Sequence, residues 1–247
     1  MIYTILMILS IVLLRSCSSL VINRSVRMSF TSSSQEASTS IVSRQRRILC
    51  YGDSLTAGTS PPFNELFPYG PYLETELNTS KEEEVVVRWR VLPGWTSQQM
   101  VDCINDSNIG LQSSLDGICN PSLSIVIILA GTNDIGQLTS SFGSTNYNID
   151  AQAVQPIIKL HKTCLNSVDD NSLDKNIHTI AIGIPSSEWQ VMNQDAATLC
   201  NDMNKALQQF ASTENRVSFI DFHFNMNEEE LTGVEMDFIL VQRDTRR

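Results

Sequence analysis

Apolar residues in this chain gather in short runs separated by polar, glycine-containing stretches. Three of the runs are nearly continuous in Val, Ile and Leu, as expected for strands that are buried on both faces of a parallel sheet. The pattern predicts five strands, at Arg47–Tyr51, Val85–Val91, Ser124–Ala130, Ile177–Ile184 and Arg216–Asp221.

Segments with helical periodicity lie between these strands. In the last of them, Leu199, Met203, Leu207 and Phe210 recur at helical spacing. Pro156 should lie early in its helix or kink it. The alternation of strand and helix predicts an α/β fold, a three-layer α/β/α sandwich with a five-stranded parallel sheet. The predicted helices are Tyr69–Leu77, Ser97–Asn105, Ile149–Val168 and Trp189–Phe210.

A serine hydroxyl lies in a tight, glycine-flanked turn directly after the first predicted strand. Residues 52–58 read Gly-Asp-Ser-Leu-Thr-Ala-Gly, with Ser54 at the centre of the turn. A catalytic serine must be exposed, oriented and next to a base. A strand-to-helix turn supplies the exposure, and the start of the helix favours developing negative charge. Ser54 is therefore a candidate nucleophile.

Two further turns follow predicted strands, one with Gly94 in Leu-Pro-Gly-Trp-Thr and one with Asn133 in Gly-Thr-Asn-Asp. Open α/β sheets build their sites at this edge. The Ser54 and Gly94 N–H groups and the Asn133 amide would give an oxyanion hole three donors. Taken singly, Gly94 also fits an ordinary loop glycine and Asn133 a turn-capping amide. Asp53 and Asp134 are expected to hydrogen-bond the surrounding loops rather than react.

These residues resemble those of the SGNH hydrolases, also called GDSL esterases and lipases, and the resemblance extends from about residue 47 to residue 221. Ser54, Gly94 and Asn133 match the serine, glycine and asparagine of the family. The resemblance implies the flavodoxin-like SGNH hydrolase fold and carboxylic ester hydrolysis through a serine acyl-enzyme. It implies no metal and no cofactor.

The family supplies its catalytic base and carboxylate from an Asp-x-x-His motif after the last strand. This chain has three histidines. His161 lies mid-helix and is expected on a solvent-exposed face, and His178 begins a strand at the sheet edge remote from Ser54. His223 follows Asp221 by two residues rather than three. Asp221 and His223 are the candidate carboxylate and base, and a surface position for His223 is the alternative.

Residues 228–247 do not resemble the closing helix of such a domain. Read one base out of frame from the third base of the Thr232 codon, the segment can encode Trp-Ser-Gly-Asp-Gly-Leu-His-Phe-Ser-Pro-Glu-Gly-Tyr. This reading contains Asp-x-x-His before a helix start. We hypothesise that the tail is aberrant, the product of a frameshifted gene model or transcript, and that the chain lacks its catalytic histidine. The version read in the shifted frame is called the frame-restored protein below.

The N-terminal region differs in charge from the rest. Residues 1–47 hold six Arg and one acid, a net charge of +5, whereas the whole chain carries −10. The apolar stretch Ile2–Leu14 is too short for a bilayer span, which takes about 20 residues, and suits a signal peptide. We expect residues 1–46 to be a signal peptide followed by a basic, Ser-rich linker or transit-like segment; an apolar N-terminus packed on the domain is the alternative.

These features predict secretion or an endomembrane lumen, with import into an organelle as the alternative. Two of the Asn-x-Ser/Thr patterns in the chain, those at Asn78 and Asn105, lie on segments expected at the surface. They are potential glycosylation sites and agree with secretion. Cys103 and Cys119 could pair in an oxidising lumen or be two small buried residues. No stable membrane span is expected.

Residues 47–227 are therefore predicted to form one ester hydrolase domain acting on a small-molecule, carbohydrate or lipid ester. The acidic body argues against nucleic-acid binding, which needs a basic surface. The alternative is a non-catalytic α/β domain that keeps the pocket without the base. A flavodoxin-like binding protein is disfavoured, because the first turn lacks a phosphate-binding glycine pattern.

Overall fold

The computed structural model describes residues 46–59, 66–80, 84–116, 123–140, 150–167 and 177–221. Residues 1–45 of the predicted N-terminal segment 1–46 lie outside these ranges, as do Cys119, His223 and the tail 228–247, whereas Arg46 already belongs to the first strand. Within them, no helix is both long and apolar enough to cross a bilayer.

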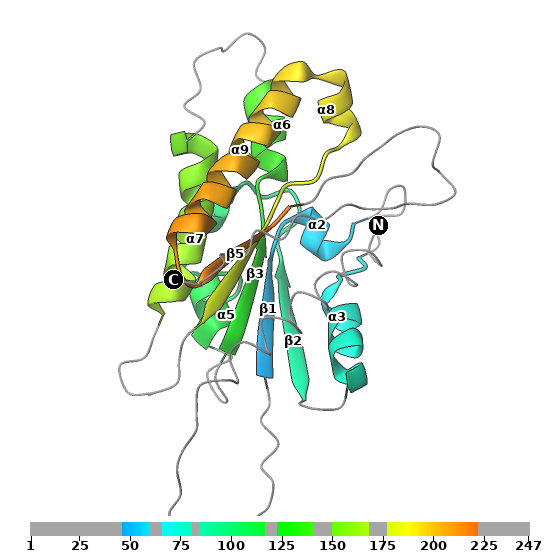
Figure 1. The fold of residues 1–247 in the computed structure, drawn as a ribbon, viewed down its shortest axis with the longest axis vertical. Coiled ribbons are helices and arrows are strands. Elements are labelled where there is room, and N and C mark those ends of the chain that lie inside the picture. The colour runs from blue at the N-terminus through cyan, green and yellow to red at the C-terminus, as the bar shows by residue number, and fades with distance from the viewer. Residues whose placement is uncertain are drawn as a thin grey trace, which may run out of the picture.

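Five parallel strands form one sheet in the order β2-β1-β3-β4-β5 (Figure 1). The chain leaves β1 toward β2 and then returns to the other side of β1, so the strand order reverses beside β1. In open α/β sheets such a switch point opens a crevice at the carboxyl ends of the strands. All five predicted strands are confirmed, with bounds Arg46–Gly52 (β1), Val85–Val91 (β2), Leu123–Leu129 (β3), His178–Ile182 (β4) and Val217–Ile220 (β5).

Helices lie on both faces of this sheet, which confirms the three-layer α/β/α architecture (Figure 1). Successive side chains of a strand point to opposite faces. Along β1, Ile48 and Cys50 pack with α3, while Leu49 and Tyr51 pack with the opposite helical layer. The helices are α2 Ser54–Ala57, α3 Gly70–Leu77, α4 Ser97–Asp102, α5 Leu111–Asp116, α6 Thr132–Ser140, α7 Gln155–Asn166, α8 Glu188–Met192 and α9 Gln194–Thr213.

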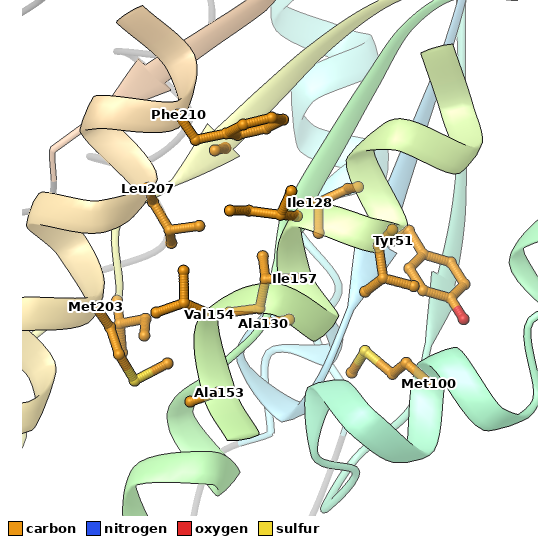
Figure 2. Packing of buried hydrophobic residues seen from close by; sticks show 14 of the residues in the cluster. Tyr51, Met100, Ile128, Ala130, Ala153, Val154, Ile157, Met203, Leu207 and Phe210 are labelled. Atoms are coloured by element: carbon orange, nitrogen blue, oxygen red, sulfur yellow. The ribbon is translucent and has the colours of Figure 1, made fainter. Parts of the chain in front are cut away.

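The larger core lies between the sheet and the layer that holds α4, α5, α6, α7 and α9. In Figure 2 the predicted apolar stripe of α9, with Met203, Leu207 and Phe210, points toward Val154 and Ile157. A π-helical turn, Asp150–Val154, leads into α7, and Pro156 occupies the first turn of that helix, as predicted. Proline is tolerated in the first turn of a helix because a backbone N–H at that position would have no intrahelical partner.

Three helix predictions needed correction. The single helix predicted over Trp189–Phe210 is divided into α8 and α9, because Asn193 has extended backbone and its side chain accepts from two N–H groups of α9. The helix predicted from Ser97 ends at Asp102. The short helices α5 and α6 were not predicted, since their Ser-, Thr-, Asn- and Gly-containing sequences favour a loop.

Asn78, one of the two potential glycosylation sites, has a structural role. Its side-chain Nδ2 donates to the carbonyl oxygens of Glu74 at 2.9 Å and Val85 at 2.8 Å, and its Oδ1 accepts from Val85 N at 2.9 Å. The amide thus joins the end of α3 to the start of β2. Cys103 is a half-buried free cysteine.

Candidate active site

Ser54 is the first residue of α2 and follows the end of β1 by two positions, as the sequence predicts. Asp53 caps the helix, since its Oδ1 accepts from Leu55 N at 2.9 Å. Gly58 ends it with a left-handed backbone, φ +63°, a conformation that glycine adopts at little cost. Ser54 is half-buried. The turn therefore holds the serine at the carboxyl end of β1.

Gly52 brings the neighbouring strands close to this turn. A Cβ at this position would lie 2.1 Å from the carbonyl oxygen of Leu129. The Gly52 carbonyl accepts from Leu92 N at 2.8 Å, and Asp53 N donates to Leu129 O at 3.2 Å. The turns after β1, β2 and β3 are thus connected at one sheet edge by main-chain hydrogen bonds.

Gly94 lies in the turn after β2 with φ +82°, and a Cβ there would meet nothing within 4 Å. The requirement for glycine at this position therefore comes from backbone conformation and not from crowding. The residue is exposed. Its main chain is consequently accessible to a bound molecule.

Asn133 is the second residue of α6 and is half-buried. Its Nδ2 donates to the main-chain oxygen of Trp95 at 2.9 Å. This bond links the turn after β3 to the turn that contains Gly94. An amide nitrogen carries two N–H groups, so the bond to Trp95 uses one of them.

A second link joins the same two turns. The Asp134 carboxylate accepts from Ser97 N at 2.9 Å and from Ser97 Oγ at 2.6 Å, and both residues are buried. Burial raises the pKa of Asp134, while the two hydrogen bonds from Ser97 act in the opposite direction. Ser97 was not predicted as part of the site. The capping box Thr96-Ser97-Gln98-Gln99 at the start of α4 was a readable signal that this turn is fixed.

The Asp53 carboxyl is fully buried beside Ser54. Burial raises its pKa to about 7, the charge of Asp134 adds to the rise, and the N–H of Leu55 opposes it. Thr132 lies near this carboxyl and also lowers its pKa. Neither Asp53 Oδ2 nor Thr132 Oγ1, however, has a partner in good hydrogen-bond geometry. Asp53 and Asp134 thus both accept hydrogen bonds from the turns around the site, and their supporting role stays a prediction.

The two described histidines lie away from this cluster. The prediction that His161 is solvent-exposed was wrong: it is fully buried between α7 and β4, its Nδ1 lies 2.9 Å from Thr179 Oγ1, and its ring contacts Phe210. His161 belongs to the apolar face of α7, which periodicity alone did not assign. His178 begins β4, as predicted, and its Nε2 lies 2.9 Å from Ser218 Oγ.

Asp221 directly follows β5 at the same edge of the sheet and is half-buried. Its charge contributes to a raised pKa of the Cys200 thiol, after the larger effect of burial. His223 lies outside the described residues, so the pairing of Asp221 with His223 stays a prediction. Among the described residues, no cluster of His, Cys, Asp or Glu is arranged to hold a metal ion.

The sequence of this chain matches the model of one known family. The sequence model of the GDSL-like lipase/acylhydrolase family matches residues 50–239, which include Ser54, Gly94 and Asn133. The match ends within the segment 228–247. A search of curated protein sequences gave no significant match.

Solved structures resemble this chain at low sequence identity, and one of them shares its fold. The lipase Lip_vut3 from a goat rumen metagenome has a TM-score of 0.55 and 14% identity, over 74% of this chain and 85% of that one. A lipase/acylhydrolase from Enterococcus faecalis gives 0.47 and 19%, over 70% and 74%. A Bacteroides fragilis protein provisionally described as an acylhydrolase gives 0.44 and 20%, over 71% and 66%. This chain thus spans just under two thirds of the Bacteroides protein.

Proposed function

The chain belongs to the GDSL-like lipase/acylhydrolase family, and from this membership we propose that it is built for hydrolysis of carboxylic esters through an acyl-enzyme on Ser54. Ser54 Oγ attacks the ester carbonyl, the alcohol leaves, and water then hydrolyses the acyl-enzyme. The observation that carries the proposal is the position of Ser54 at the start of α2, with the turns of Gly94 and Asn133 connected to it at one edge.

The negative charge of the tetrahedral intermediate needs donors that are fixed in advance. We assign this role to the N–H groups of Ser54 and Gly94 and to the second N–H of the Asn133 amide. The hydrogen bonds from Asn133 to Trp95 and from Ser97 to Asp134 support the assignment, because they tie α6 to the turn of Gly94. Donors held in place cost no reorganisation when charge develops.

The reaction also needs a base that takes the Ser54 proton and returns it to the departing alkoxide. His161 is enclosed between α7 and β4, and His178 lies at the amino end of its strand. We therefore propose that the chain as written lacks its base, in line with the frameshift hypothesis. This favours the second candidate function, a non-catalytic domain with a retained substrate pocket. Asp221 with His223 is the pair that would replace the missing base.

Hydrolysis of p-nitrophenyl acetate by four proteins tests these proposals: the chain as written, its Ser54→Ala and His223→Ala variants, and the frame-restored protein. The frame-restored protein should hydrolyse the ester, and a fluorophosphonate probe should label it at Ser54 only. The chain as written should be no faster than its Ser54→Ala variant.

Labelling that persists after Ser54→Ala in the frame-restored protein would exclude Ser54 as the nucleophile. Activity of the chain as written that disappears in both Ser54→Ala and His223→Ala would instead identify His223 as the base. The frameshift hypothesis would then be wrong.

A further inference from the structure

The short helix α8 buries a polar side chain and exposes its apolar ones, which is the reverse of an ordinary surface helix. Its one buried side chain is polar, Gln190, at 8% exposed, whereas its apolar side chains face outward. Trp189 is 42% exposed, and Val191 and Met192 are each 76% exposed. A surface helix ordinarily turns its apolar side chains inward. Contiguous exposed apolar residues indicate a surface that binds something.

Hydrogen bonds at both ends hold this reversed orientation. Gln190 Oε1 accepts from Ser187 N, which fixes the buried amide at the start of the helix. The indole Nε1 of Trp189 donates to Thr139 Oγ1 of α6 at 3.0 Å, and Asn193 N donates to Trp189 O at 2.9 Å. The helix therefore cannot rotate to bury Val191 and Met192 without losing the bond to Thr139.

The exposed residues lie at the same end of the molecule as the candidate active site. The chain enters α8 from β4, beyond the carboxyl edge of the sheet, and α8, α6 and α2 lie at the same end of the molecule (Figure 1). Through Thr139, Trp189 is attached to the helix whose first turn carries Asn133. A surface that bound α8 would therefore face the end of the molecule that carries the Ser54 turn (Figure 1).

The charged residues around α8 indicate which kind of surface it could bind. From residue 184 to residue 198, and along α6, there is no Lys, Arg or His. The exposed charged residues of these segments are Glu188 and Asp195, since Asp134 is buried against Ser97. Anionic membranes are recognised by clusters of Lys and Arg. An acidic border around apolar side chains fits an uncharged or zwitterionic surface, and a partly exposed Trp suits the boundary between headgroups and acyl chains.

We propose that α8 docks the protein on a neutral lipid surface through Trp189, Val191 and Met192. Substrates taken from that surface would be esters with apolar acyl chains. This statement about the substrate rests on the proposed function. The docking itself requires no catalysis, so it holds for the chain as written and for the frame-restored protein alike.

Vesicles of phosphatidylcholine with brominated acyl chains test the docking, since bromine quenches a tryptophan only on contact with the hydrocarbon. The full chain should be quenched. Quenching should persist in Trp89→Phe, which changes another half-exposed tryptophan, and should be lost in Trp189→Phe. Comparison of these two variants separates α8 from lipid contacts made elsewhere in the chain.

A second pair of variants measures affinity for the same vesicles. Val191→Ser with Met192→Ser should weaken binding about tenfold or more, because two apolar side chains no longer leave water. The control Leu66→Ser with Tyr72→Ser, which also removes two exposed apolar side chains, should change binding little. Ser54→Ala should bind as the parent does, so a failure of catalysis does not affect the test.

Three results would overturn the inference. The first is quenching that is absent or unchanged in Trp189→Phe. The second is a difference in binding between the parent and the Val191→Ser, Met192→Ser variant that appears only when phosphatidylserine is added. The third is loss of self-association in the Val191→Ser, Met192→Ser variant, by sedimentation, with unchanged vesicle binding. That result would assign α8 to a contact with a second copy of the chain.

Discussion

The side-chain amide of Asn133 donates a hydrogen bond to the main-chain oxygen of Trp95 over 2.9 Å. The bond crosses from the first turn of α6 to the turn that contains Gly94. Two proposed oxyanion donors, which lie far apart in the sequence, therefore hold each other in position. The chemical role that we propose for Asn133 can be separated from this structural one by experiment.

Asn133→Ala in the frame-restored protein should lower kcat by roughly 10²–10³, because one donor to the developing charge is lost. The loss of the bond to Trp95 should lower the free energy of unfolding by only about 1 kcal/mol. Steady-state kinetics and urea unfolding measure the two effects. The exposed residue Asn108 supplies the control, Asn108→Ala. A change confined to KM would mean that Asn133 binds substrate and transition state equally.

Asp134→Ala should destabilise the chain by about 1–3 kcal/mol, since the buried N–H of Ser97 would lose its acceptor. Ser97→Ala removes only the bond from the hydroxyl and should cost less. A double-mutant cycle of the two substitutions, followed by urea unfolding, should give a coupling energy of about 0.5–3 kcal/mol. Additive effects would contradict a direct link between α4 and α6.

His161 should make stability fall in acid. Burial lowers its pKa to about 3, against 6.5 for an ordinary histidine. Below pH 6.5 the unfolded chain therefore binds a proton that the folded chain does not, and stability falls as the pH drops toward 3. Relative to a His161→Gln variant, the parent should lose roughly 2 kcal/mol between pH 7 and pH 5. Urea unfolding at a series of pH values checks this, and parallel curves would contradict it.

Asp53 should have the opposite effect on the pH dependence of stability, which it should make fall as the pH rises. Burial raises its pKa to about 7 from 3.8, so the folded chain holds a proton that the unfolded chain releases between these values. This contribution to stability is present below pH 3.8 and is lost as the pH rises toward 7. Asp53→Asn should remove the loss, and its stability relative to the parent should increase from pH 4 to pH 7. Measurements in the His161→Gln background prevent the opposing histidine effect from hiding it.

Of the two potential glycosylation sites, Asn105 should be modified and Asn78 should not when the chain passes through a secretory pathway. Both N–H groups of the Asn78 amide are used between α3 and β2, whereas Asn105 is exposed in a turn. Mass spectrometry of glycopeptides distinguishes the sites, with Asn105→Gln as the control that should remove the glycan. A glycan on Asn78 would show that its hydrogen bonds form too late to protect it.

The sequence by itself determined the sheet and the edge where the site is built. Continuous Val and Ile runs can bury both faces only in a parallel sheet covered by helices. Such strands all end at one edge, so the residues just after them, Ser54, Gly94 and Asn133, had to lie along it. The glycines of these turns were also informative in the sequence. Gly58 and Gly94 have positive φ, a conformation that favours glycine over other residues.

Only the tertiary structure decided which side chains meet and which way they face. The bonds from Ser97 to Asp134 and from Asn133 to Trp95 join residues 37 and 38 positions apart, and spacing along the chain does not encode such contacts. His161 was expected on a solvent-exposed face and is buried instead, through contacts with Thr179 and Phe210 from other elements. The outward apolar face of α8 was hidden too, because a five-residue helix is too short to show a period and its orientation is set by its bond to Thr139.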